Sequence, residues 1–150
     1  MYFAADRSFV LLQALKSCIN GHRFQASLTP MSHCVQLHEA INVAIKTLQS
    51  LGDLDAQAKK AVNLIEDCLR AGNKLLICLT TSGKSKNIAR ALEEARARKL
   101  KTITLLGRDG GSTIGMADVD LVVKSDSTAR IQEAHQLLLH VLCEIIESQL

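Results

Sequence analysis

The sequence has no tryptophan, and aromatic residues make up only 3% of its 150 residues, although 47% are hydrophobic. Its core must therefore be built from aliphatic side chains. No apolar run approaches the roughly 18 residues that a membrane-spanning helix needs, so we expect no membrane association. The formal net charge of +3 is too small to predict direct nucleic-acid binding. The length is that of a single domain, large enough to bury a core.

The cysteines form no CxxC pair and show no zinc-finger spacing. An odd number of cysteines in apolar surroundings predicts reduced, buried thiols in a cytoplasmic protein. The five are Cys18, Cys34, Cys68, Cys78 and Cys143.

Helical and strand patterns alternate along most of the chain. Two amphipathic helices come first, one from Ser32 to about Leu51 and one after Asp53, which we expect to cap it. Their apolar faces predict either a cover for a sheet or an oligomer interface. Gly72-Asn73 is expected to end the second helix, whose apolar face comprises Leu54, Ala58, Ala61, Val62, Ile65 and Leu69. Short apolar runs predict three strands, and Ser125-Asp126-Ser127 can start a last helix. Strands alternating with helices predict an α/β fold, a parallel sheet flanked by helices. The predicted strands are Leu75–Leu79, Thr102–Leu106 and Val119–Val123.

The first predicted strand runs directly into a loop rich in hydroxyls, and a helix follows. Strand, small-residue loop and helix N-terminus together favour an anion site, and Gly83 would let the backbone approach a ligand. A nucleotide P-loop is excluded because Cys78 stands where that motif needs glycine. The alternative is an ordinary turn in which Ser82 or Ser85 caps the helix. The loop hydroxyls belong to Thr80, Thr81, Ser82 and Ser85.

The last helix carries a wide apolar arc, which predicts that it is mostly buried, and a narrower polar stripe that faces either solvent or a polar cavity. Gln132 and His140 lie eight residues apart in this stripe, on one face of the helix. A lone helical histidine is more often solvated than functional. His135 lies nearer the buried border and is predicted to be structural.

Two stretches together resemble one protein family. LTTSGKSKNIARALEEARARKLKTITLLGRDGG resembles the sugar isomerase (SIS) domain of phosphoheptose isomerases, and TARIQEAHQLLLHVLCEIIE resembles their C-terminal helix. The similarity is close from Leu79 to about Glu147 and weaker from Met31 to Cys78. It implies a three-layer SIS-type parallel sheet flanked by helices, reduced to about three strands, with N-terminal helices. Residues 1–30 are predicted to be an extension outside the family match, and residues 31–150 a shortened SIS domain.

The resemblance also implies a function and a site. The family interconverts sedoheptulose 7-phosphate and a heptose 7-phosphate, in the biosynthesis of bacterial heptose and lipopolysaccharide. Gln132 and His140 would line the active site and help to bind zinc where zinc is present, and His140 would be catalytic in proton transfer. The substrate would be a phosphorylated sugar. Its phosphate would be bound by Thr80, Thr81, Ser82 and Ser85.

One part of the family pattern is missing. KLLIC passes directly into LTTSGKS, without the intervening family segment whose HxxxE motif supplies a catalytic glutamate and the other metal ligands. Aldose–ketose isomerisation needs both a base and an acid, so turnover is expected to be impaired. A three-stranded sheet also leaves an edge or apolar surface uncovered, which predicts a homo-oligomer, a dimer or tetramer.

Two other interpretations stay open. The bacterial regulator that associates with the replication initiator is a similar SIS protein, and the missing glutamate favours such a non-catalytic scaffold. The third is an abbreviated chain without independent function. The intact TSGKS loop with Gln132 and His140 favours the isomerase type.

Overall fold

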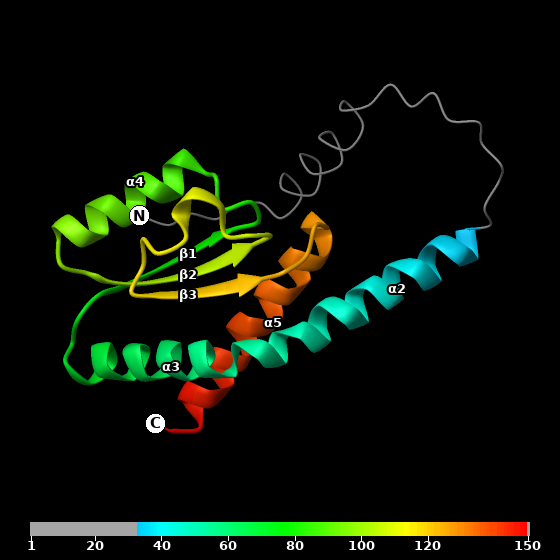
Figure 1. Cartoon of the computed structure of the whole chain (residues 1–150). Coiled ribbons are helices and arrows are strands. Elements are labelled where there is room, and N and C mark those ends of the chain that lie inside the picture. The colour runs from blue at the N-terminus through cyan, green and yellow to red at the C-terminus, as the bar shows by residue number, and fades with distance from the viewer. Residues whose placement is uncertain (1–32, 150) are drawn as a thin grey trace, which may run out of the picture. The chain divides into compact units, whose positions relative to one another are not determined.

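The structure is a computed structural model that describes residues 33–149, with side chains from residue 36 onward. The predicted extension at 1–30, Cys18 and the side chain of Cys34 lie outside the described residues. Figure 1 shows the elements in chain order. They are α2 (His33–Gln49), the 3₁₀ turn η1 (Ser50–Leu54), α3 (Asp55–Arg70), β1 (Leu75–Thr80), α4 (Lys86–Ala97), β2 (Lys101–Gly107), the 3₁₀ turn η2 (Gly111–Thr113), β3 (Val119–Val123) and α5 (Thr128–Glu147).

The strands form a parallel sheet in the order β1-β2-β3, which confirms the predicted α/β fold. Cα partners such as Leu76 with Thr102 and Ile103 with Val119 fix the register. The central strand β2 is buried from Thr102 to Gly107. Helix α4 packs on one face of the sheet, and α3 and α5 lie on the other, so the domain has three layers (Figure 1).

The core is aliphatic, as the shortage of aromatic residues predicts. It joins the inner faces of α3 and α5 to the two strands β2 and β3. The side chains that are fully inaccessible to solvent include Ile103, Leu105, Leu121, Val123 and Ile131.

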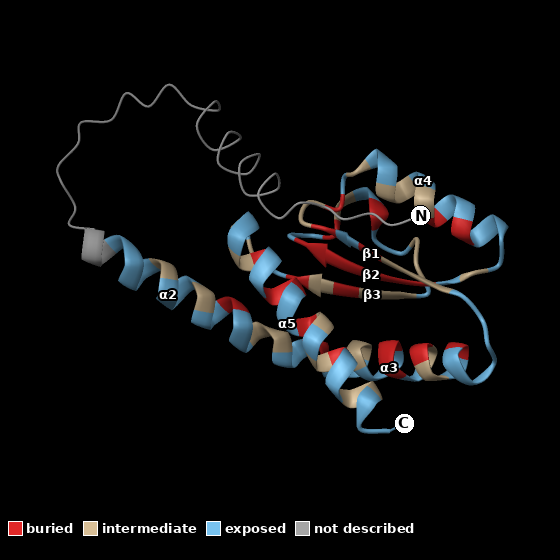
Figure 2. Ribbon diagram, turned by 180° about the vertical axis from the view of Figure 1, so that it is seen from behind, coloured by how far each residue is buried: buried red, intermediate tan, exposed pale blue. Residues whose placement is uncertain are grey.

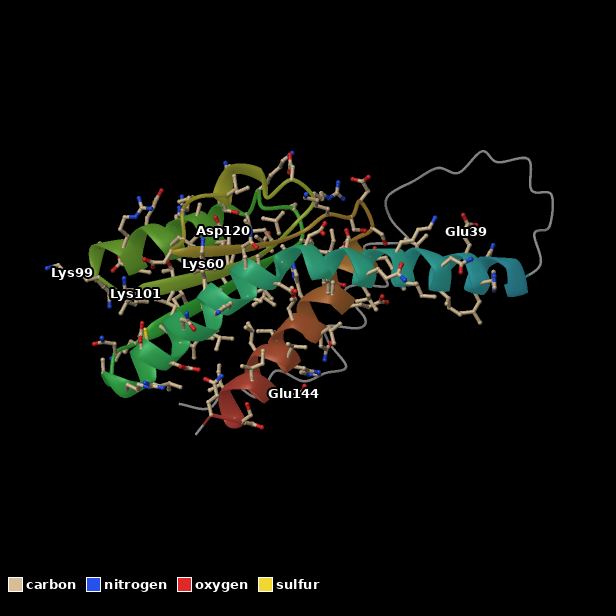
Figure 3. The ribbon with its side chains drawn as sticks, turned by 60° about the horizontal axis from the view of Figure 1, so that its bottom comes forward. Glu39, Lys60, Lys99, Lys101, Asp120 and Glu144 are labelled. Carbon is tan, nitrogen blue, oxygen red and sulfur yellow. The ribbon has the colours of Figure 1, made fainter. Side chains whose placement is uncertain are left out.

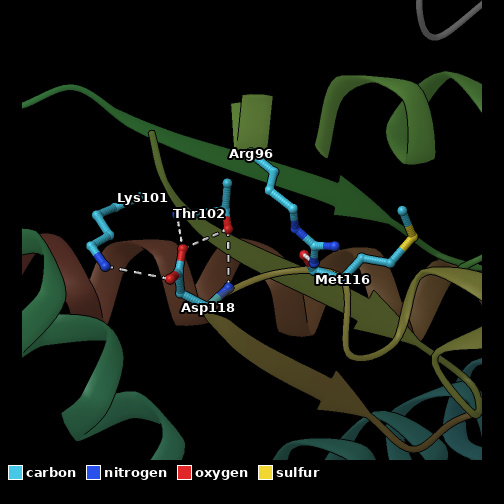
Figure 4. Close-up of polar contacts among 5 residues, drawn as sticks. All are labelled: Arg96, Lys101, Thr102, Met116 and Asp118. Carbon is cyan, nitrogen blue, oxygen red and sulfur yellow. Dashed lines mark hydrogen bonds and ion pairs between the residues drawn. The ribbon is translucent and has the colours of Figure 1, made fainter. Parts of the chain in front are cut away.

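A polar clamp fixes the start of β2 to the segment before β3 (Figure 4). Asp118 Oδ2 accepts hydrogen bonds from Thr102 N and Thr102 Oγ1, both at 2.8 Å. Asp118 N donates to Thr102 Oγ1 at 3.0 Å, and Lys101 Nζ lies 3.6 Å from Asp118 Oδ1. Arg96 Nη2 donates to Met116 O at 3.0 Å and fastens α4 to the same segment.

Two helix boundaries follow the predicted signals. Gly72, with φ of +65°, ends α3, and Ser127 caps α5 by accepting from Arg130 N at 3.5 Å. The prediction that Asp53 caps α3 is wrong. Asp53 lies inside η1, and the capping position is Leu54, whose side chain has no oxygen to offer.

Helix α2 does not cover the sheet, which excludes one of the two predicted uses of its apolar face. Its residues are mostly exposed, and Figure 2 shows this along the helix. Leu37, Ile41 and Ile45 are 64%, 46% and 47% exposed.

Two details of the other apolar faces also differ from prediction. On α3, Cys68 is buried and Leu69 is exposed, because Cys68 shares a helix face with the buried Ala61 and Ile65. On α5, Leu137 is exposed and Val141 is half-buried, so the helix is less buried than predicted.

The three described cysteines are unpaired. Cys68 and Cys78 are buried as predicted, and burial raises the pKa of the Cys78 thiol. Cys143 is exposed, against the prediction, because it shares a helix face with the exposed His140 and Glu147. Within residues 33–149, none of the helices combines the length and the apolar character that crossing a membrane requires.

Candidate functional site

The loop after β1 is held by hydrogen bonds to its own backbone and to the next loop. Thr80, the last residue of β1, accepts a hydrogen bond from Gly83 N at its Oγ1, over 3.2 Å. Gly83 O in turn accepts from Thr113 N at 3.0 Å and from Thr113 Oγ1 at 3.1 Å. Thr113 is completely buried, so these bonds are shielded from water and fix the loop to η2.

Gly83 is required for packing between loops, a role that its sequence pattern did not indicate. Its φ is +61°, and a Cβ atom there would lie 1.9 Å from Gly110 O and 2.8 Å from Gly111 N. The missing side chain therefore makes room for the backbone at Gly110 and Gly111.

The start of α4 carries polar groups that are not used within the helix. Ser85 occupies the N-cap position, yet within the described structure its hydroxyl makes no capping hydrogen bond. Ser82 Oγ accepts from Lys84 N at 3.3 Å instead of from the helix. The predicted alternative, in which either serine caps α4, is therefore not what the structure shows. The first-turn N–H groups, which have no intrahelical acceptors, and the Ser85 hydroxyl remain available for an anion.

A pocket of about 730 Å³ lies between this loop and α5. It brings together five of the six residues predicted from the sequence, Thr80, Thr81, Ser85, Gln132 and His140. Ser82 is not among its lining residues. The other lining residues are Leu79, Asn87, Ile88, His135, Gln136 and Leu139.

The position of α5 beneath the loop depends on Gly107. A Cβ at Gly107 would lie 2.4 Å from Thr81 O and 2.7 Å from Ile131 Cγ2, so the loop and the first turns of α5 both approach the end of β2 closely. One turn later, His135 Nε2 lies 3.2 Å from Leu106 O. Because a carbonyl only accepts, Nε2 carries the proton and donates.

His135 is buried, with 3% of its surface exposed, as expected for a structural residue. Burial lowers the pKa of His135, and its hydrogen bond to Leu106 O only partly opposes that shift. His135 is therefore neutral near pH 7. His140, by contrast, is exposed on the pocket side of α5.

Sequence reasoning missed two polar residues of the pocket. Asn87 lies in the first turn of α4, and its place beside the hydroxyl loop was the signal for it. Gln136 belongs to the polar stripe of α5, midway between Gln132 and His140. The recurrence of polar side chains at every fourth residue was the signal for Gln136.

Among the described residues, the pocket lining includes no aspartate or glutamate. Glu133 is turned to Arg130, with its Oε1 2.6 Å from Arg130 Nη2. Glu144 lies one turn after His140 and is exposed on α5 (Figure 3). Neither carboxylate lines the pocket of its own chain, so a second acid–base group of this kind would have to come from a neighbouring subunit.

The residues present do not make a complete zinc site. Zinc in proteins takes three or four protein ligands, and Gln132 with His140 supplies two. The part of the chain that the structure describes contains no group of three or more His, Cys, Asp or Glu arranged to hold a metal.

A larger cavity, of about 900 Å³, lies between η1 and the loops that follow β2 and β3. Its lining mixes charges of both signs, so their fields largely offset one another and indicate no one class of ligand. The charged residues are Lys84, Arg108, Lys124, Asp53, Asp109, Asp120 and Asp126.

The fold and the pocket define a three-layer α/β protein whose hydroxyl-rich loop after β1 leads into the N-terminus of α4 beside a pocket. No family model matches the chain. The chain is 54% identical over 76 residues to the phosphoheptose isomerase of Leptospira biflexa, and this match covers 51% of this chain and 39% of the relative. It is 39% identical over 108 residues to the phosphoheptose isomerase of Nitratiruptor, which covers 72% of this chain and 57% of that one.

Solved structures show the same fold. A phosphoheptose isomerase from Francisella tularensis matches with a TM-score of 0.74 at 24% identity, over 79% of this chain and 100% of that one. The phosphoheptose isomerase from Neisseria gonorrhoeae matches with a TM-score of 0.75 at 23% identity, over 78% of this chain and 100% of that one. The chain is thus a shortened homologue of phosphoheptose isomerases. It spans 39% to 57% of the length of the curated relatives described above.

Proposed function

We propose that the chain binds phosphorylated sugars of the phosphoheptose isomerase type, sedoheptulose 7-phosphate or a heptose 7-phosphate, in the pocket between β1, α4 and α5. The observation that carries the proposal is the convergence of Thr80, Thr81 and Ser85 with Gln132 and His140 on one pocket, although more than 45 residues separate the two groups in the sequence. The phosphate would lie at the start of α4, and the sugar along α5. The names of the sequence relatives support this choice of ligand.

His140 is the residue we propose for proton transfer. Moving a proton between adjacent carbons needs a base and an acid, and the described pocket offers His140 without a carboxylate. His135 already donates a hydrogen bond from Nε2 to Leu106 O, so we do not assign it to proton transfer. We therefore propose a protein that binds its sugar phosphate and turns it over slowly or not at all.

The second candidate is a non-catalytic SIS scaffold, in which the pocket senses a sugar phosphate or is left unused. The pocket without a carboxylate favours this candidate. A scaffold that leaves the pocket unused would have no need of the free Ser85 hydroxyl or the open first turn of α4. Phosphate binding therefore separates the proposed function from that form of the scaffold.

We further propose a homo-oligomer in which α2 contacts a second copy. Leu37, Ile41 and Leu48 are exposed at steps of four and seven residues, the spacing of a helix–helix seam. On its other side, α2 is fixed to its own domain, because Arg130 Nη1 donates to Ala40 O at 2.8 Å. A cytoplasmic location is proposed as well, and the unpaired state of Cys68, Cys78 and Cys143 supports it.

A binding measurement tests the proposed function. Ser85→Ala removes the pocket hydroxyl and is expected to weaken the binding of sedoheptulose 7-phosphate by about 1.5–3 kcal/mol, the usual contribution of a hydrogen bond to a charged group. Ser82→Ala is the matched control, because Ser82 lies in the same loop outside the pocket lining. Unchanged affinity in Ser85→Ala, or no binding by the unmodified chain, would refute the proposed site.

A further inference from the structure

Gln136 is the middle member of a polar row on α5 that faces the pocket. Gln132, Gln136 and His140 follow at intervals of four residues, and all three line the pocket. At a rise of about 1.5 Å per residue, Gln136 lies about 6 Å along the helix from each neighbour, and the whole row covers about 12 Å. A ligand that touches both ends of this row must pass Gln136.

One end of the row lies next to the hydroxyl loop. Gly107 is in close contact with both Thr81 O and Ile131, the residue immediately before Gln132. From there α5 runs on past His135, whose bond to Leu106 O fixes the helix against β2 beside Gln136. The row therefore leads away from the loop, with Gln132 nearest to it and His140 farthest from it.

The side-chain chemistry at Gln136 suits the hydroxylated carbon chain of a single sugar. A glutamine amide offers both an acceptor oxygen and a donor NH₂, which together can pair with neighbouring hydroxyl groups. Leu139 and Leu79 add apolar surface to the same pocket, against which the C–H groups of a sugar can lie. Gln136 itself is exposed within the protomer, so an amide–hydroxyl bond would replace its contact with water.

We propose, resting on the function proposed above, that Gln136 is a specificity-determining residue that binds the middle hydroxyls of a phosphorylated sugar. With the phosphate at the loop that ends in Ser85, a seven-carbon sugar extends past Gln136 toward His140. A three-carbon sugar phosphate ends before it. Gln136 thus favours long sugar phosphates over short ones without contributing to phosphate binding.

Calorimetric titration of the full chain with three ligands tests this assignment. The ligands are sedoheptulose 7-phosphate, glyceraldehyde 3-phosphate and inorganic phosphate. Gln136→Leu is expected to weaken binding of the heptulose phosphate by about 3- to 10-fold, the loss of one ordinary hydrogen bond, and to leave the other two affinities unchanged. Gln149→Leu, at an exposed position outside the pocket, is the matched control and should leave all three unchanged.

The outcomes separate this inference from the proposed function. Unchanged heptulose phosphate affinity in Gln136→Leu, or an equal loss for all three ligands, overturns the role of Gln136, even where Ser85→Ala still weakens binding. If the unmodified chain binds none of the ligands, the proposed function fails and this inference with it. Gln136→Ser, measured alongside and compared by circular dichroism, gives a folded variant should the leucine variant unfold, and the same selective loss is expected.

Discussion

Gly83 and Gly110 lie in direct backbone contact, and this contact joins the hydroxyl loop to the loop after β2. A side chain at Gly83 would begin 1.9 Å from Gly110 O, and the φ of +61° is itself unfavourable for any other residue. The loop that we assign to the phosphate therefore owes its shape to a neighbouring loop far away in the sequence.

Gly83→Ala is accordingly expected to destabilise the protein by about 2–4 kcal/mol, from left-handed backbone strain together with the clash. Gly72→Ala is the matched control, since Gly72 has φ of +65° and a Cβ atom there would meet nothing within 4 Å. The free energy of unfolding of Gly72→Ala should fall by only about 1–2 kcal/mol, from backbone strain alone. Urea unfolding measures both, and equal losses would show that the Gly110 contact contributes nothing.

The clamp at Asp118 predicts a loss of stability in acid. Burial on its own would raise the pKa of Asp118, but the hydrogen bonds from Thr102 and the charge of Lys101 outweigh it and hold the pKa below its ordinary value. A carboxyl whose pKa is lowered on folding stabilises the protein above its unfolded pKa, and this contribution is lost as the pH falls through the folded pKa.

Asp118→Asn should therefore be less stable than the unmodified protein at pH 7, and the difference should shrink as the pH falls below about 4, the ordinary pKa of aspartate. Asp67→Asn, on the exposed side of α3, is the control. Thermal unfolding between pH 7 and pH 3 measures the trend. A difference independent of pH would contradict the assigned role of the ionised carboxylate.

The exposed row on α2 predicts assembly that depends on apolar contact. Replacing Leu37 and Ile41 together by lysine should reduce the number of copies in the oligomer, because the lysine charges would have to be buried against the second copy. Asn42→Lys, at an exposed position of the same helix, should leave it unchanged. Light scattering after gel filtration gives the molecular mass of the unmodified protein and of both variants. An unmodified protein that is monomeric at all concentrations would refute the oligomer proposal.

Zinc is expected to bind poorly, since the pocket supplies only Gln132 and His140 as ligands within the described residues. Metal analysis of protein purified without added zinc should find well under one zinc per chain. Stoichiometric zinc that is lost in His140→Ala would instead show that further ligands come from another copy or from residues outside the described range.

The sequence predicts local features of this fold well. The bounds of β3 are as predicted, and Ser127 caps α5 through a short-range pattern that needs no tertiary information. Asp53 failed as a cap because η1 continues directly from α2 and carries the chain one residue farther before α3 begins. Periodicity also placed Leu69 on the apolar face of α3, whereas the structure exposes Leu69 and buries its neighbour Cys68.

The candidate site was harder to predict, because its two walls are distant in sequence. Ser85 and His140 were identified separately, through a local loop pattern and through resemblance to a family, and nothing local shows that they share a pocket. Gln136 carried no family signal. Its place in the pocket follows only from how α5 packs beneath β2.

The most direct test is an NMR titration of isotope-labelled protein with sedoheptulose 7-phosphate, which reports binding and turnover in one sample. We predict that the backbone signals of Ser85, Gln132 and His140 shift with increasing ligand, whereas the sugar phosphate itself is converted at least about 10²-fold more slowly than a complete acid–base pair would allow. Signals at these residues that stay in place, or rapid conversion that disappears in His140→Ala, would contradict a binding protein of impaired turnover.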